Sequence, residues 1–164
     1  PDDSLAVAQR EGRLHRNFQG YTTHSECDLV SLGVSAIGQT DDAYFQNNHD
    51  LPSWEAAIDA GQLAITKGVN LPRDDRIRRW VIGQLICQFR LDRQLFADVW
   101  NEDLNRYFAD ELSRLKPMVQ DELIADDGNA LQVQPAGRLL IRAICQIFDL
   151  YRKEGASQRF SRII

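Results

Sequence analysis

The pattern of apolar and polar positions separates a mixed first part of the chain from a mostly helical second part. In the second part, apolar residues recur every four positions from Ile77 to Phe89, which predicts a helix with one buried face. Further helices are expected over 95–100 and 101–115, and Pro135 is expected to open the last one. The apolar stripe of that last helix comprises Leu140, Ile144, Ile147, Phe148 and Tyr151.

A β-hairpin is predicted ahead of the last helix. Pro117 is expected to begin a turn before it, and Asp127-Gly128 between two apolar runs favours a tight hairpin turn. Helices followed by a hairpin and a further helix resemble a winged helix, so a nucleic-acid-binding module is one alternative. The stretch 101–115 would then contact the nucleic acid, but its acidic side chains outnumber its basic ones and would repel phosphates. We therefore expect no nucleic-acid partner.

The first 48 residues are predicted to form short strands and loops after a helix. One strand is expected over 15–20, and the β-branched stretch 29–38 predicts a short buried strand. Small residues in that second strand allow a ligand to approach the backbone closely, although they equally relieve crowding within a sheet. Farther along, Pro52 is expected to begin a short helix and the stretch 68–72 to interrupt the chain.

Composition narrows the class of protein. The chain has 164 residues, 43% of them hydrophobic and 26% charged, with a net charge of −5, which is typical of a soluble globular protein. Its apolar runs are far shorter than the ~18–20 residues that cross a bilayer, and no secretory signal is visible. Three scattered cysteines suit free thiols in a reducing compartment, and the histidines follow no zinc-binding spacing. We expect a cytoplasmic protein with no membrane partner and no metal site of its own.

Five stretches carry a resemblance to a known family. They are Asn-Phe-Gln-Gly-Tyr-Thr-Thr (17–23), Leu-Gly-Val-Ser-Ala-Ile (32–37), Tyr-Phe-Gln-Asn (44–47), the stretch 138–149 with its Arg138, Arg142 and Phe148-Asp149, and Phe-Ser-Arg-Ile-Ile (160–164). In this order they resemble the C-terminal part of the oxygen-independent coproporphyrinogen III oxidases, a radical S-adenosylmethionine family of haem biosynthesis. The chain also begins at Pro1 without a methionine, so we expect a piece of a longer protein.

The resemblance implies an α+β fold that is mostly helical. Residues 1–48 would supply the last strand and helix elements of a partial (β/α) radical-SAM barrel. Residues 49–164 would form a helical, winged-helix-like C-terminal domain that covers the active site. A relative in the same superfamily that acts as a haem chaperone is the other alternative.

The resemblance also implies a reaction and its cofactors. Coproporphyrinogen III would be converted to protoporphyrinogen IX by radical oxidative decarboxylation of two propionates, with S-adenosylmethionine and a [4Fe–4S] cluster as cofactors. The Cys-x-x-x-Cys-x-x-Cys motif that holds such a cluster is absent from this sequence. The cluster ligands are therefore expected upstream, in the missing N-terminal barrel of the same protein, with which this part would associate. The chain alone is expected to be inactive, with no catalytic residue and no metal ligand of its own.

Five residues are the predicted binding positions. Ile37 matches a family position whose backbone contacts S-adenosylmethionine, and Phe18 and Gln19 match positions that line the same cavity; the alternative is that these residues belong to the barrel core. Arg138 and Arg142, four positions apart and expected on one face of the last helix, are predicted to bind propionates of the substrate, because a guanidinium pairs well with a carboxylate. The alternative for the arginines is a structural ion pair with a neighbouring carboxylate. Further candidates of the same kind are Arg76, Arg78 and Arg79, and weaker ones are Arg159 and Arg162.

Overall fold

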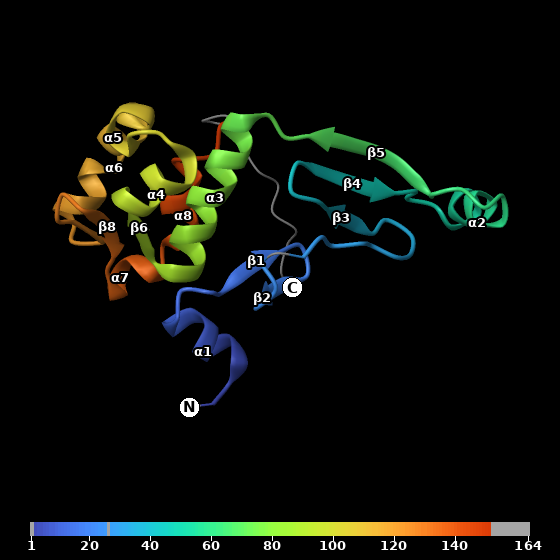
Figure 1. Cartoon of the computed structure of the whole chain (residues 1–164), viewed down its shortest axis with the longest axis horizontal. Helices are drawn as coiled ribbons and strands as arrows, with labels where there is room; N and C mark the ends of the chain where they lie inside the picture. The colour runs from blue at the N-terminus through green and yellow to red at the C-terminus, as the bar shows by residue number, and fades with distance from the viewer. Residues whose placement is uncertain (1, 26, 152–164) are drawn as a thin grey trace, which may run out of the picture. The chain divides into compact units, whose positions relative to one another are not determined.

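A computed structural model describes residues 2–25 and 27–151 of the chain. The chain forms two compact units, Pro1–Gln88 and Phe89–Ile164, which are considered separately below (Figure 1). The division between the units falls later than residue 48. The expected end of a barrel at that residue stays a prediction.

The first unit begins with a helix and a β-hairpin. Helix α1 (Ser4–Arg10) starts where the carboxylate of Asp3 accepts a hydrogen bond of 2.9 Å from the backbone N–H of Ala6. Strands β1 (His15–Asn17) and β2 (Gly20–Thr22) are antiparallel. The prediction of a continuous strand over 15–20 is therefore wrong beyond Asn17.

The side chain of Asn17 explains why the chain turns there. Its Oδ1 accepts hydrogen bonds from the backbone N–H groups of Gln19 (2.9 Å) and Gly20 (3.2 Å), which closes a local turn. Gly20 has a φ of +135°, a conformation that side chains rarely adopt. Phe18 and Gln19 consequently lie at the tip of the hairpin rather than within a strand.

A three-stranded antiparallel sheet follows in the order β3-β4-β5 (Figure 1). Its strands are β3 (Ile37–Gln39), β4 (Ala43–Asn47) and β5 (Ile65–Asn70). Helix α2 (Leu51–Asp59) joins β4 to β5 and has Asp50 as its cap. It begins at Leu51, one residue before the predicted start at Pro52, which lies in its first turn. The predicted interruption at 68–72 is wrong over its first three residues, because β5 continues to Asn70.

The predicted buried strand over 29–38 is also largely wrong. Only Ile37 and Gly38 of that stretch belong to β3, while Leu29 forms an isolated bridge to Gln39. Leu32 is 89% exposed, so the intervening residues form a surface loop rather than a core strand. The loop is tied to β4 by the side chains of that strand.

Helix α3 (Arg73–Gln88) completes the first unit and confirms the predicted stripe. Ile77, Val81 and Leu85 are buried at the expected four-residue spacing. Phe89 lies just beyond the helix with a φ of +54°, a left-handed conformation that ends it.

The second unit packs short helices around a small antiparallel sheet. Its elements are β6 (Arg90–Asp92), α4 (Arg93–Trp100), α5 (Leu104–Tyr107), α6 (Ala109–Gln120), β7 (Ile124–Asp126), β8 (Ala130–Val133), α7 (Pro135–Arg138) and α8 (Ile141–Gln146). The sheet order is β6-β8-β7. The core contains an aromatic cluster in which Phe108 contacts Phe96 and Phe148, with ring centroids 5.9 Å and 5.3 Å apart.

The predicted hairpin is confirmed as β7 and β8. Asp127 accepts hydrogen bonds from the backbone N–H groups of Asn129 (2.8 Å) and Ala130 (2.7 Å), and Gly128 has a φ of +83°. Asp127 itself does not adopt a positive φ, so glycine alone supplies the left-handed residue of this turn.

Three helix predictions in this unit need correction. The single helix expected over 101–115 is divided at Phe108, which ends α5 and precedes α6. Pro117 lies inside α6 rather than at the start of a turn. The last helix breaks after Arg138, so Arg138 and Arg142 belong to two short helices, α7 and α8, and not to one helical face.

This mixture of helices and short sheets agrees with the expected α+β class. A barrel end and a winged-helix likeness stay predictions. Across residues 2–25 and 27–151, the helices are all too short or too polar to cross a membrane.

Candidate functional site

The predicted binding residues Phe18 and Ile37 line one pocket of the first unit. Its volume is about 250 Å³. The eight residues that line it are Phe18, Ile37, Tyr44, Phe45, Gln46, Lys67, Gly68 and Val69. Most of these lie on the three-stranded sheet, so strand register decides which side chains face the pocket.

The register places polar and apolar side chains in two rows on one face of the sheet. Ile37 lies opposite Gln46, and Gln46 lies opposite Lys67, so these three side chains share a face. The next row on the same face contains Tyr44 and Val69. The pocket therefore has a sheet floor with Ile37 at one side and Lys67 at the other.

An aromatic pair closes the pocket on the hairpin side. The rings of Phe18 and Tyr44 meet edge to face with centroids 5.2 Å apart. Phe18 remains 55% exposed, so part of its side chain is open to a ligand. The turn held by Asn17 presents this ring from the hairpin tip to the sheet.

Gln19 is the one predicted cofactor residue that the pocket does not include. It is exposed beside Phe18 in the same turn. The structure thus brings two of the three predicted positions together and leaves Gln19 at the hairpin tip.

Side-chain amides hold the loop that leads into Ile37. Gln46 Nε2 donates to the carbonyl oxygen of Ser35 at 2.9 Å, and Asn47 Nδ2 donates to that of Gly33 at 2.9 Å. Asn47 is buried, so loss of its bonds would leave an unsatisfied amide inside the unit. These bonds fix the backbone just before Ile37, and sequence reasoning did not identify them because both partners lie far along the chain.

Arg79 supports Tyr44 from another direction. Its guanidinium lies over the Tyr44 ring, 5.6 Å from the centroid, and donates to the carbonyl oxygen of Thr40 at 3.3 Å. Burial lowers the pKa of His15, and the charge of Arg79 lowers this pKa further. Both effects favour the neutral form of His15, which is the first residue of β1.

The three arginines of α3 have partners within the first unit. Arg76 and Arg79 pair with Asp41, and Arg78 pairs with Asp74 at 2.8 Å. These contacts match the structural alternative considered for the arginines. Arg159 and Arg162, with the stretch 160–164, lie outside the described residues.

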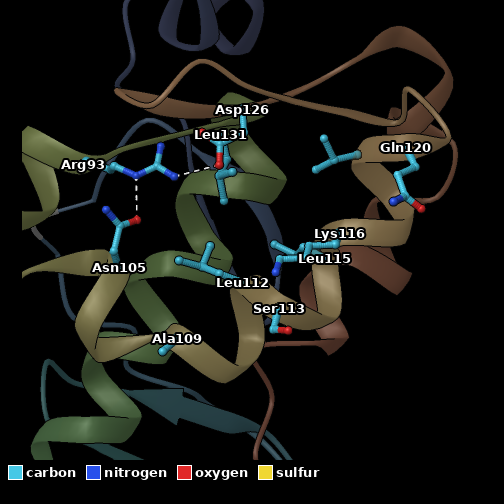
Figure 2. A pocket seen from close by; sticks show the side chains of 11 residues that line it. Arg93, Asn105, Ala109, Leu112, Ser113, Leu115, Lys116, Gln120, Asp126 and Leu131 are labelled. Carbon is cyan, nitrogen blue, oxygen red and sulfur yellow. Dashed lines mark hydrogen bonds and ion pairs between the residues drawn. The ribbon is translucent and has the colours of Figure 1, made fainter.

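The second unit has a hollow of its own, of about 570 Å³, lined by parts of α4, α5, α6 and the hairpin (Figure 2). Arg93 is one of the residues that line this hollow. Its Nε donates a hydrogen bond to Asn105 Oδ1 at 2.9 Å, and its Nη2 forms an ion pair with Asp126 Oδ2 at 2.9 Å. Partial burial acts to raise the pKa of Asp126, but hydrogen bonds from Arg93 and Gly128 lower it overall. These paired charges link α4 to the hairpin, and none of the five predicted binding residues lies here.

The two predicted substrate arginines have different surroundings. The guanidinium of Arg138 lies 4.5 Å from the ring centroid of Phe89, a cation–π contact. Arg142 is exposed on α8 and, among the described residues, makes no ion pair with Asp149 or with any other carboxylate. The structure therefore leaves Arg142 available for a ligand but does not place it with Arg138 on one face.

The described residues do not fit an iron–sulfur cluster or another clustered metal. Within 2–25 and 27–151, no three histidine, cysteine or carboxylate side chains gather closely enough to hold a metal ion. Cys27 is exposed, while Cys87 and Cys145 are buried.

The comparisons with known proteins agree with the resemblance over the whole chain. The family model described as the HemN C-terminal domain matches residues 71–140. Oxygen-independent coproporphyrinogen III oxidase from Pseudomonas aeruginosa is 49% identical over 167 residues, and the enzyme of that name from Escherichia coli K12 is 49% identical over 165. Each alignment covers 100% of this chain and 36% of the relative.

A solved structure agrees with these sequence relatives. It is described as coproporphyrinogen III oxidase (HemN) from Escherichia coli, a radical SAM enzyme, and matches with a TM-score of 0.88 at 49% identity. The match covers 93% of this chain and 35% of the solved one. The chain thus spans about a third of the length of its relatives. Over that span it belongs to the family of the oxygen-independent coproporphyrinogen III oxidases, with the HemN C-terminal domain within it.

Proposed function

We propose that this chain is the C-terminal part of an enzyme that oxidatively decarboxylates two propionates of coproporphyrinogen III to give protoporphyrinogen IX in haem biosynthesis. The observation that carries the proposal is the 49% identity to the Escherichia coli oxidase across the whole chain. The meeting of Phe18 and Ile37 in one pocket supports it, because both were predicted to contact the same cofactor.

The pocket of the first unit is proposed to receive part of S-adenosylmethionine. Its volume of about 250 Å³ is below that of most complete ligand sites, which suits a pocket finished by residues outside this chain. The ring of Phe18 offers an apolar face to a planar base, and the backbone at Ile37 offers hydrogen-bonding groups at the edge of β3. Gln19, beside Phe18, is proposed to contact the cofactor from the hairpin tip.

The radical chemistry of this reaction belongs to S-adenosylmethionine and a [4Fe–4S] cluster. The cluster is proposed to be held by a Cys-x-x-x-Cys-x-x-Cys motif in the N-terminal barrel of the same protein. Residues 1–48 are proposed to be the last elements of that barrel and 49–164 a domain that covers the active site. A cover of this kind excludes water from reactive intermediates.

The proposal is tested by substituting Ile37 in the full-length enzyme. Ile37→Asp places a charge at the wall of the pocket, and we expect at least a tenfold loss of S-adenosylmethionine affinity. Leu32→Asp is the matched control, because Leu32 is 89% exposed and lies outside the pocket. Equal cofactor affinity in wild type and Ile37→Asp would remove Ile37 from the site.

The assignment of the cluster to another part of the protein has its own test. The purified chain is expected to bind no iron after anaerobic reconstitution and to cleave no S-adenosylmethionine, because its described part gathers no ligand set. Iron and sulfide analysis measures this directly. A stoichiometric [4Fe–4S] cluster on the chain would contradict the proposal.

A further inference from the structure

The pocket of the first unit has one charged residue in its lining. Phe18, Ile37, Tyr44, Phe45, Gln46, Gly68 and Val69 are uncharged, and Lys67 is the exception. Register places Lys67 directly across from Gln46 and two strands away from Ile37, on the same face of the sheet. An ammonium group therefore borders a largely apolar cavity that also contains an exposed aromatic ring.

Lys67 has no partner among the described residues. Neither a hydrogen bond nor an ion pair engages its side chain, which is exposed at the pocket. The arginines of the same unit differ, since Arg76 and Arg79 are held by Asp41 and Arg78 by Asp74. Lys67 is thus available to a ligand, whereas those neighbouring cations are engaged by the protein.

The positions of the aromatic and charged side chains that line the pocket indicate which chemical groups a ligand should carry. Tyr44 and Lys67 are diagonal neighbours across β4 and β5, a relationship that places Cα atoms about 7–8 Å apart. Phe18 and Tyr44 form the aromatic side, and Lys67 forms the charged side. A molecule with a flat or apolar portion and a carboxylate a few bonds away satisfies both sides at once. An ion pair is strengthened where apolar side chains displace water from one side of it.

We propose that Lys67 binds a carboxylate of the molecule that occupies this pocket. Two molecules of the proposed reaction carry one: S-adenosylmethionine has a methionyl carboxylate, and coproporphyrinogen III has propionates. The inference rests on the proposed function and adds to it a specificity-determining residue. It also accounts for a cation in a lining that is otherwise uncharged.

The experiment compares three variants of the full-length enzyme. Lys67→Met removes the charge and keeps the length of the side chain, and Lys67→Arg restores a cation. Lys116→Met is the matched control, since Lys116 lines the hollow of the second unit and is outside this pocket. Dissociation constants are measured for S-adenosylmethionine, for its decarboxylated analogue and for coproporphyrinogen III.

We expect Lys67→Met to weaken binding of one carboxylate ligand by about five- to tenfold, as suits a partly exposed ion pair. Weaker binding of S-adenosylmethionine, with unchanged affinity for the decarboxylated analogue, assigns Lys67 to the methionyl carboxylate. Weaker binding of coproporphyrinogen III, with unchanged affinity for S-adenosylmethionine, assigns it to a propionate. In either case Lys67→Arg recovers most of the affinity and Lys116→Met has no effect.

Three outcomes overturn the inference. Affinities that all stay within about twofold of wild type show that Lys67 binds neither carboxylate. An equal loss with the decarboxylated analogue shows that the contact does not involve a carboxylate, and an equal loss in Lys116→Met shows a nonspecific charge effect. Loss of S-adenosylmethionine affinity in Ile37→Asp, with every affinity of Lys67→Met unchanged, would overturn the inference and leave the proposed function standing. Failure of the wild-type enzyme to bind S-adenosylmethionine and coproporphyrinogen III would instead remove the proposed function.

Discussion

The carbonyl oxygen of Leu123 occupies the space in which a side chain on Gly137 would begin. A Cβ atom added to Gly137 would clash with that oxygen and would lie 3.1 Å from Cγ1 of Val133. The oxygen is fixed in place because it accepts a hydrogen bond of 2.9 Å from the backbone N–H of Gln134. Helix α7 therefore approaches the hairpin as closely as it does only because residue 137 is glycine.

Gly137→Ala is expected to destabilise the second unit by about 1–3 kcal/mol, because backbone rather than a flexible side chain must move to admit the methyl group. Denaturant unfolding of the full-length protein, followed by a probe in this unit, measures the change. Gly83→Ala is the control, since Gly83 lies within α3 with no atom near its Cβ position. That variant is expected to gain up to about 1 kcal/mol from helix propensity. Equal stability of the two variants would contradict the close approach.

Elements specified by neighbouring residues were predictable from the sequence. The four-residue stripe of α3, the Asp127-Gly128 turn and the start of α2 beside Pro52 all depend on residues within a few positions of one another. The stretch 29–38 was misread because its β-branched residues suggested a strand, whereas Gln46 and Asn47 hold most of it as a loop. The donors of these hydrogen bonds lie outside the stretch 29–38, so the pattern of apolar and polar residues within the stretch does not reveal them.

The candidate site divides in the same way. The resemblance indicated Phe18 and Ile37, and the structure shows that a hairpin tip and a strand bring them into one pocket. Lys67 was missed because its position beside them follows from the pairing of β4 with β5, and β5 was expected to be interrupted. The break between α7 and α8 was missed because Leu139 and Leu140, which separate the two helices, are both residues that favour a helix.

Cysteine reactivity gives a second prediction. Burial raises the pKa of the Cys87 thiol to about 11, although the charge of Arg16 acts to lower it. The thiolate is the reactive form, so Cys87 should resist alkylation near neutral pH while the exposed Cys27 is modified. Peptide mapping by mass spectrometry after brief alkylation of the full-length protein measures both sites. Modification of Cys87 at the same rate as Cys27, without denaturant, would show that α3 opens readily.

The two arginines near the end of the described chain should respond differently to substitution. Arg142 is exposed and has no carboxylate partner among the described residues, so Arg142→Ala should leave the melting temperature unchanged. If it binds a propionate, the same variant should raise KM for coproporphyrinogen III. The fall in kcat/KM should correspond to a loss of about 1.5–3 kcal/mol of transition-state stabilisation.

Arg138→Ala should instead lower the melting temperature, because it removes a guanidinium from the Phe89 ring. An unchanged KM in Arg142→Ala would show that Arg142 does not bind a propionate of the substrate.

The last prediction concerns the pH dependence of stability and depends on His15. Burial lowers the pKa of His15 below its usual value of 6.5, and the positive charge of Arg79 acts in the same direction. Because the folded state holds this proton less tightly than the unfolded state, the unfolded state binds more protons once the pH falls below about 6.5. The stability contributed by neutral His15 is therefore fully present above that pH. It is lost progressively as the pH falls through the window between the unfolded and the folded pKa.

His15→Gln keeps a polar side chain of similar size but removes the titration. We expect its free energy of unfolding to fall less than that of wild type between about pH 7.5 and pH 5.5. His24→Gln serves as the control, because His24 is exposed in the loop after β2 and belongs to the same unit. Urea unfolding across this pH range supplies the measurement, with the slope of stability against pH as the readout. A slope in His15→Gln that matches wild type would show that His15 is solvated in the folded protein and that Arg79 does not act on it. A shallower slope in His15→Gln, but not in His24→Gln, would show that the environment of His15 in the hairpin, including the charge of Arg79, lowers its pKa in the folded protein.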